Sequence, residues 1–293
     1  MFRGSYVALI TPMTEQGQVD YVSLQHMVQY QLDNGTDGLI IMGTTGEAAT
    51  IPFSEQLDVL RAVLSQVAGR CQVLAGNGSN STAEAVEKTK VLTELAIDGF
   101  LTVTPYYNKP TQQGMVAHFK AVAAATDKPV LLYNVPGRTG VDLLPATVAS
   151  LAAVTNIVGI KEATGSLERL AQLQAVCPTD FDLLSGDDAS AAAFILQGGH
   201  GVISVTTNVA PLAMSRMIQA ALAGDATSAQ AIDATLQRLH RDLFIESNPI
   251  PTKWALRRMG LIASDMARLP LTQLEPIHAV AIEQALQQAN IHF

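Results

Sequence analysis

Short apolar segments recur along most of the chain, and each of them ends at glycine, proline or a polar residue. They are nearly continuous in valine, isoleucine and leucine, which is typical of parallel strands covered on both faces. The segments between them have helical spacing, for example residues 21–33, 54–67, 82–95 and 115–125, with start signals at Ser54 and Thr82. The pattern predicts eight strands, at residues 7–11, 38–43, 72–77, 100–105, 130–134, 157–161, 181–185 and 201–205.

Alternating strand and helix units of this kind are what a closed (β/α)8 barrel, or TIM barrel, requires. No Gly-x-Gly-x-x-Gly motif follows the first strand, so a dinucleotide-binding fold is not favoured. Further along, residues 227–243, 250–260 and 275–290 have helical spacing without strands between them. We therefore predict an α/β protein with a barrel over residues 1–224 and a C-terminal helical region over residues 225–293 that packs on it.

Composition and charge narrow the range of functions. Of the 293 residues, 48% are hydrophobic, which suits a folded protein with a large aliphatic core. The formal net charge of -8 disfavours a nucleic-acid partner, which would require a basic face. Cys71 and Cys177 form no CxxC or Cys/His cluster, so neither a disulfide framework nor a zinc site is indicated. We find no signal-peptide pattern and no apolar stretch of membrane-spanning length, and we expect a cytoplasmic protein without a membrane partner.

Lys161 is the strongest candidate for chemistry, because it alone of the seven lysines ends an apolar strand. Active sites of (β/α)8 barrels form at the carboxyl ends of the strands. Burial there disfavours an ammonium and makes neutral amine available, which attacks ketones to form a Schiff base. The alternative is a lysine paired with a carboxylate such as Glu162 at the barrel rim.

Two other strand ends carry groups that suit such chemistry. Tyr133 ends the neighbouring strand, so its phenol could exchange protons with a group bonded to Lys161, or could be a core aromatic residue with a solvated hydroxyl. Thr44 and Thr45 follow the second strand, where hydroxyl and backbone N–H groups can hold a carboxylate. Thr44 and Glu47 also fit a capping box at a helix start, and the two interpretations are compatible.

Three loops add polar or aromatic groups. Arg138 follows the fifth strand and suits bidentate binding of a carboxylate, or is a solvated loop charge. Tyr106 and Tyr107 are adjacent on the loop after the fourth strand, as at an interface or over a pocket. Asp187 and Asp188 follow the seventh strand, where they would repel a phosphate and more simply cap the next helix. We expect no phosphate site, and no spacing in the sequence indicates a metal or another cofactor.

With these motifs the chain resembles the dihydrodipicolinate synthase (4-hydroxy-tetrahydrodipicolinate synthase) family, essentially from end to end. That family lies in the pyruvate-dependent class I aldolase or N-acetylneuraminate lyase superfamily, whose members share the Gly43 to Glu47 motif and the lysine strand. The paired tyrosines and the stretch from Asn248 to Pro251 are similar to the synthase branch in particular. The matching stretches are 43–47, 102–108, 133–136, 159–163, 185–188 and 248–254.

The resemblance implies a lyase that condenses pyruvate with L-aspartate 4-semialdehyde in the diaminopimelate route to lysine. By that resemblance Lys161 forms the imine with pyruvate, and the resulting enamine attacks the aldehyde. A proton relay would join Thr44, Tyr133 and Tyr107, the last supplied by a neighbouring subunit of a homotetramer built from tight dimers.

The resemblance also assigns the binding groups. Thr45 would hold the pyruvate carboxylate and Arg138 the carboxylate of the semialdehyde, while backbone groups at Gly186 and Ile203 line the site.

Some members of the family bind lysine as a feedback inhibitor, and the chain matches that candidate site in part. The matching residues are Ala49, Asn80, Glu84 and Tyr106. Phe53 and Gln56 stand where strongly inhibited members carry histidine. Asn77 stands near the barrel mouth where threonine is usual.

Two other functions remain open from the residues. One is a pyruvate-dependent lyase or aldolase acting on a sugar acid, which would need polar groups where Arg138 offers a carboxylate clamp. The other is a barrel without catalysis, which would have lost a catalytic position. The sugar-acid enzyme is distinguished by its aldehyde preference.

Overall fold

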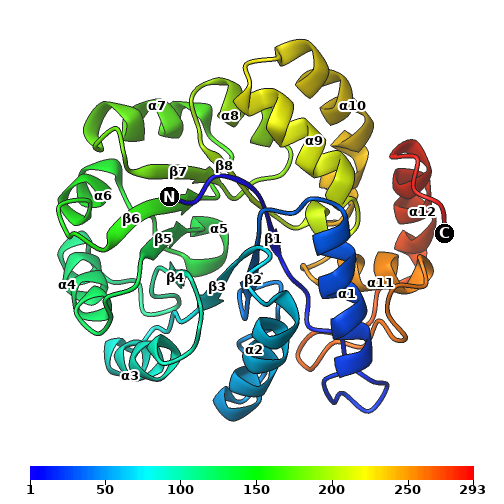
Figure 1. Cartoon of the computed structure of the whole chain (residues 1–293), viewed down its shortest axis with the longest axis horizontal. Helices are drawn as coiled ribbons and strands as arrows, with labels where there is room; N and C mark the ends of the chain where they lie inside the picture. The colour runs from blue at the N-terminus through cyan, green and yellow to red at the C-terminus, as the bar shows by residue number, and fades with distance from the viewer.

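The computed structural model describes residues 1–293 and forms a closed barrel of parallel strands in chain order, with β8 paired to β1 (Figure 1). The predicted barrel is therefore confirmed. The strands are β1 (Gly4–Ala8), β2 (Gly38–Ile41), β3 (Gln72–Gly76), β4 (Gly99–Val103), β5 (Val130–Asn134), β6 (Ile157–Glu162), β7 (Asp182–Ser185) and β8 (Gly201–Ser204).

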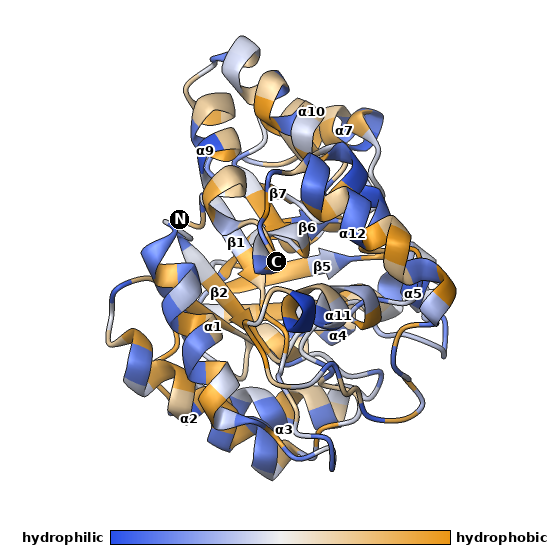
Figure 2. Cartoon of the chain, turned by 90° about the vertical axis from the view of Figure 1, so that its right-hand side faces the viewer, coloured by the Kyte–Doolittle hydropathy of each residue, from blue (hydrophilic) through white to orange (hydrophobic).

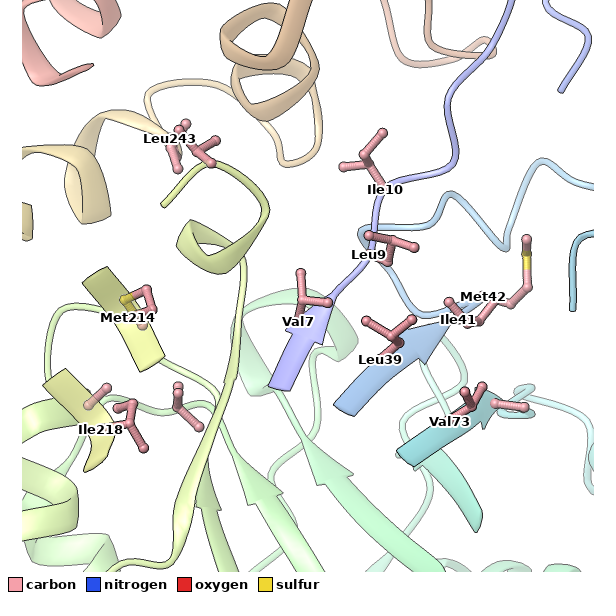
Figure 3. Packing of buried hydrophobic residues seen from close by; sticks show 14 of the residues in the cluster. Val7, Leu9, Ile10, Leu39, Ile41, Met42, Val73, Met214, Ile218 and Leu243 are labelled. Carbon is pink, nitrogen blue, oxygen red and sulfur yellow. The ribbon is translucent and has the colours of Figure 1, made fainter. Parts of the chain in front are cut away.

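Successive side chains of each strand enter two different apolar layers. Tyr6, Ile40 and Leu74 belong to a cluster inside the barrel. Their strand neighbours Val7 and Leu39 belong to the larger cluster between the barrel and its helices, which Figure 3 shows together with side chains of α9. Both faces of every strand are thus buried, which explains why the sequence shows continuous rather than alternating apolar runs.

Most helices of this part of the chain cover the outside of the barrel, while the short α5 (Pro136–Thr139) lies at the end of β5 (Figure 1). The others are α1 (Tyr21–Asp33), α2 (Phe53–Val67), α3 (Thr82–Thr93), α4 (Gln112–Ala123), α6 (Pro145–Leu151), α7 (Leu167–Val176), α8 (Ala191–Leu196) and α9 (Pro211–Leu222), with a 3-10 turn η1 (Thr206–Asn208) after β8. None of the protein's helices is both long and apolar enough to cross a membrane.

The two predicted helix-start signals are displaced in the structure. Helix α3 begins at Thr82 itself, and the capping side chain is Ser81, whose hydroxyl accepts a hydrogen bond from the backbone N–H of Glu84. Helix α2 begins one residue before Ser54, after Pro52, without any side-chain cap. Ser54 therefore lies inside the first turn of the helix rather than at its N-cap.

The C-terminal segment forms helices α10 (Ala226–Asp242), α11 (Ile250–Arg258) and α12 (Ala279–Gln288), with a second 3-10 turn η2 (Pro276–His278). Helix α10 packs against α9 and α12, and α11 reaches the η1 turn at the end of β8. These helices gather on one side of the barrel, near α1 and α9, and α12 and α11 face the viewer in Figure 2. The predicted C-terminal helices are confirmed, and they approach the end of the barrel where the strands finish.

Candidate active site

A cavity of about 470 Å³ opens at the carboxyl ends of the strands. Its wall includes six of the residues selected from the sequence. They are Thr44, Thr45, Tyr133, Arg138, Lys161 and Gly186. These residues come from the ends of β2, β5, β6 and β7, so the barrel brings together positions that are as much as 142 residues apart, from Thr44 to Gly186.

Lys161 rises from β6 into this cavity. Its residue is only 6% exposed, and its Cα pairs with those of Tyr133 on β5 and Leu184 on β7. The Nζ atom lies 4.3 Å from the centre of the Tyr133 ring. No carboxylate lies within ion-pair distance of this nitrogen, because Glu162 is directed elsewhere: its oxygens accept hydrogen bonds from Asn134 Nδ2 at 3.3 and 3.1 Å. The alternative of a Lys161–Glu162 ion pair is therefore wrong.

Glu162 belongs to a polar network on the outer side of the lysine strand. Burial raises the pKa of this carboxyl, and the Asn134 amide and the Thr164 backbone N–H oppose the rise by donating hydrogen bonds. Arg169 lies 3.7 Å from Glu162 and forms a two-pronged pair with Asp142, with N···O distances of 3.0 and 2.7 Å. These bonds join β5, β6 and α7 directly behind Tyr133 and Lys161.

Gly186 packs against the stem of Lys161. A Cβ at this position would lie 2.8 Å from Lys161 Cε and 2.7 Å from the Cβ of Ala163, closer than real Cβ contacts. The Gly186 backbone N–H donates a 2.7 Å hydrogen bond to the carbonyl of Glu162. A residue without a side chain is therefore favoured here, because it leaves room for the lysine side chain.

The loop after β2 carries Thr44 and Thr45. Thr44 is exposed in the cavity, whereas Thr45 is 3% exposed and its Oγ1 accepts a 2.9 Å hydrogen bond from Asn248 Nδ2. Met42 and Glu47, at the two ends of the turn, have left-handed backbone angles, with φ of 58° and 57°. Such conformations cost about 1–3 kcal/mol each and persist only when the surroundings hold them.

The capping-box interpretation of Thr44 and Glu47 is wrong. The nearest helix, α2, begins at Phe53, and the Glu47 carboxylate instead forms a buried ion pair with Lys253 of α11. Burial lowers the pKa of the Lys253 ammonium, and the Glu47 charge opposes that effect.

Arg138 lies in α5, on the rim of the cavity. Its side chain is exposed and no carboxylate pairs with it; Nη2 donates a 3.4 Å hydrogen bond to the carbonyl of Asn248. A guanidinium that faces a cavity with most of its donors free is suited to bind an anion.

The two acids after β7 serve the loops rather than a helix end. Asp188 Oδ2 accepts hydrogen bonds from the backbone N–H groups of Val205 and Thr206, at 3.0 and 2.9 Å, and so ties this loop to the end of β8. Asp187 Oδ2 accepts from the backbone N–H of Ser190, just before α8. The expected capping of the next helix by one of these acids is wrong, because α8 begins after Ser190 and has no side-chain cap.

Ile203 does not reach the cavity wall. It is 1% exposed and belongs to the apolar cluster inside the barrel, while Val205, two residues further on, lines the cavity.

The cavity also has residues that the sequence did not reveal as site residues. His240, Arg241, Phe244 and Asn248 line it from the C-terminal segment. His240 is 2% exposed, and its Nδ1 is 2.8 Å from the hydroxyl of Thr206 at the end of β8. Of these four residues, only Asn248 belongs to a motif that the sequence analysis names. That motif resembles the family but does not indicate that Asn248 contacts Thr45.

Tyr107 stands apart from the cavity of its own chain. Its residue is 88% exposed, its φ is 74°, and its backbone N–H donates a 3.2 Å hydrogen bond to the carbonyl of Thr139. Tyr106 beside it is 38% exposed. The single chain therefore does not bring Tyr107 to Lys161.

The candidate lysine-binding residues lie near α2 and α3. Glu84 already has partners: its Oε1 is 3.0 Å from Lys88 Nζ and its Oε2 accepts from Ser79. The Lys88 bond lowers the pKa of this carboxyl. Gln56 is buried, and its amide donates to the carbonyls of Ala48 and Ile51.

The fold and the cavity at its carboxyl end define a (β/α)8-barrel enzyme. The family model described as "Dihydrodipicolinate synthetase family" matches residues 1–289. The 4-hydroxy-tetrahydrodipicolinate synthase of Methylococcus capsulatus is 55% identical over 291 residues, which cover 99% of this chain and 100% of the relative.

Solved structures agree with that match. The chloride-inhibited dihydrodipicolinate synthase of Acinetobacter baumannii, complexed with pyruvate, is 45% identical with a TM-score of 0.97, over 100% of both chains. The enzyme of Cyanidioschyzon merolae with lysine bound is 42% identical with a TM-score of 0.96, over 99% of both chains. The chain belongs to the dihydrodipicolinate synthetase family, whose members are lyases.

Proposed function

We propose that this protein condenses pyruvate with L-aspartate 4-semialdehyde to give 4-hydroxy-tetrahydrodipicolinate, through a Schiff base on Lys161. The observation that carries the proposal is a single buried lysine without an ion-pair partner, on the wall of the cavity and against the Tyr133 ring. Chains that are similar from end to end bear the name of this synthase.

The proposed reaction begins when the neutral amine of Lys161 attacks the ketone carbon of pyruvate and water leaves to form the imine. Loss of a proton from the pyruvate methyl group gives an enamine, whose carbon forms a bond to the aldehyde carbon. The amino group of the semialdehyde then attacks the imine carbon, closing the ring and releasing Lys161. The net change is one carbon–carbon bond, one ring and one water.

The cavity offers two hydroxyl groups that can move protons. Tyr133 lies against the amine, and Thr44 is exposed in the same cavity, so the two hydroxyls can carry protons to and from the reacting carbon and oxygen atoms. Thr45 and the neighbouring backbone would hold the pyruvate carboxylate, and Arg138 that of the semialdehyde. Gly186 leaves the space beside the lysine stem that the imine needs.

We infer that Tyr107 completes the relay from a second copy of the chain, within a homotetramer built from dimers. Tyr107 is almost fully exposed, and its left-handed backbone is held by a hydrogen bond to Thr139. Such an aromatic side chain is suited to contact a partner chain. Co-expression of Lys161→Ala and Tyr107→Phe chains tests this inference. Hybrid dimers would contain one complete site, giving about a quarter of wild-type activity, whereas sites built from one chain would stay inactive.

The proposed substrate is tested by aldehyde preference. Pyruvate consumption is followed by proton NMR with aspartate semialdehyde and, separately, with N-acetylmannosamine. Consumption with the semialdehyde alone supports the proposal. Consumption with the sugar alone would keep the Schiff base and replace the substrate, and consumption with neither would favour a barrel without catalysis.

A further inference from the structure

A buried ion pair joins the C-terminal helix α11 to the loop that carries Thr44 and Thr45. The carboxylate of Glu47 contacts the ammonium of Lys253, and neither side chain has any exposed surface. Lys253 Nζ also donates a 2.7 Å hydrogen bond to the carbonyl of Met266. The second oxygen of Glu47 accepts a 2.9 Å hydrogen bond from the backbone N–H of Arg268. Two separate parts of the C-terminal region therefore hold one carboxylate of the loop.

The loop is held at its neighbouring residues as well. Asn248 binds the Thr45 hydroxyl, and the Thr11 hydroxyl donates a 2.7 Å hydrogen bond to the carbonyl of Gly46. Glu47 itself has the left-handed φ of 57°, which a glutamate adopts only under constraint. The Glu47 carboxylate lies three residues after Thr44 and two after Thr45, so its anchoring fixes the turn that presents both hydroxyls.

An ion pair in such a place requires an explanation beyond stability. Buried pairs can often be replaced by apolar residues without loss of stability, because removing two charges from water offsets their attraction. Unlike an apolar contact, a charge-assisted hydrogen bond also holds the carboxylate in one orientation. Orientation is what a carboxylate-binding loop needs, and the pair lies outside the residues that line the cavity.

We propose that Glu47 and Lys253 are positioning residues, which hold the Thr44–Thr45 turn in the orientation that receives the pyruvate carboxylate. Through Lys253, helix α11 would thus hold a loop of the active site in place, although Lys253 does not line the cavity. This inference rests on the proposed function, because it takes pyruvate as the ligand of the turn.

The test compares Lys253→Met, Glu47→Gln and the double variant Glu47→Gln/Lys253→Met. The readouts are the pyruvate concentration that gives half-maximal borohydride trapping, the KM values for both substrates, and the urea midpoint of unfolding. All three variants should need at least about tenfold more pyruvate, with KM for the semialdehyde changed by less than about twofold. The double variant should unfold at a higher urea concentration than Lys253→Met, because it leaves no unpaired buried charge.

Leu286→Ala is the matched control. Leu286 is fully buried in α12, so its truncation destabilises the same C-terminal region without touching the turn. Its pyruvate dependence should equal that of the wild type. A double variant with wild-type pyruvate dependence would overturn the inference, and so would a Leu286→Ala protein with the same rise as Lys253→Met. Failure of the wild type to trap pyruvate at all would instead refute the proposed function.

Discussion

Lys161 Nζ lies 4.3 Å from the centre of the Tyr133 ring, because the two residues are Cα partners on adjacent strands and both side chains reach the cavity. A phenol held this close can reach an oxygen or carbon atom bonded to the lysine nitrogen. Strand register thus sets the distance between the lysine nitrogen and the tyrosine ring, and the network behind the strands joins β5 and β6 beside this pair.

Tyr133→Phe should lower kcat by about 10²- to 10⁴-fold, the range expected when a general acid–base group is removed. The ring is retained, so the cavity wall and the contact between the ring and Lys161 Nζ remain. Pyruvate should therefore still be trapped on the lysine, although more slowly. Steady-state kinetics with a trapping time course separates the two effects, and a Tyr133→Phe enzyme with wild-type kcat would remove the phenol from the mechanism.

Arg138→Met should raise KM for aspartate semialdehyde by about 10- to 100-fold, the loss expected for one charge-assisted contact. Trapping of pyruvate in the absence of the aldehyde should be unchanged, because Arg138 is assigned to the second substrate. Arg258→Met, which breaks an exposed pair with Glu283 on the C-terminal helices, is the control for loss of a surface arginine. An equal rise in the pyruvate requirement would reassign Arg138 to the first substrate.

Stability should fall as the pH decreases from about 6.5 to about 4, because of His118. Burial lowers the pKa of this imidazole to about 4, whereas in the unfolded chain it titrates near 6.5. Between those values the unfolded state binds the extra proton, so the free energy of unfolding decreases by up to roughly 3 kcal/mol as the pH falls. The contribution is fully present above the unfolded pKa.

Urea midpoints at pH 7 and pH 4.5 measure this dependence. His118→Gln should reduce the difference between the two midpoints, and His26→Gln, at an exposed position on α1, should leave it unchanged. Identical pH dependence in His118→Gln and the wild type would contradict the assignment.

Free lysine should bind weakly, with no saturating heat at about 1 mM in a calorimetric titration. The Glu84 side chain is exposed, so its ion pair with the partly buried Lys88 costs little to break. Two neighbouring residues should weaken lysine binding more. The ring of Phe53 offers no hydrogen-bonding atom, and the amide of Gln56 already donates hydrogen bonds to two backbone carbonyls. A saturating isotherm in the wild type that disappears in Glu84→Gln would show the candidate site to be functional and the expectation of weakness wrong.

The fold could be predicted because burial on both faces leaves a continuous apolar run for each strand. The ends of strands were less predictable, since an apolar run reports burial rather than pairing. The run at residues 7–11 illustrates this: the strand is Gly4–Ala8, and Leu9 and Ile10 remain buried after pairing ends. Helix α4 begins at Gln112, three residues before the predicted start, because Thr111 caps it ahead of the apolar pattern.

Residues of the candidate site could be predicted where they lie at the end of a strand. They could not be predicted where they come from the C-terminal segment. Lys161, Tyr133 and Thr45 follow from the rule that barrel sites lie at strand ends. Asn248 contacts Thr45 across 203 positions of sequence, and nothing local to either residue indicates that contact. Asn77 is similar: it is buried, donates to Thr89 Oγ1 and accepts from Thr102 Oγ1, partners that only the fold identifies.

If Lys161 forms an imine with pyruvate, borohydride reduction in the presence of pyruvate should leave a stable adduct that peptide mass spectrometry detects. We expect one reduced pyruvyl group on the peptide that contains Lys161, and none in Lys161→Met, with urea unfolding showing that the variant is folded. Modification of another lysine, equal modification of the variant, or an unmodified wild-type chain would contradict this expectation.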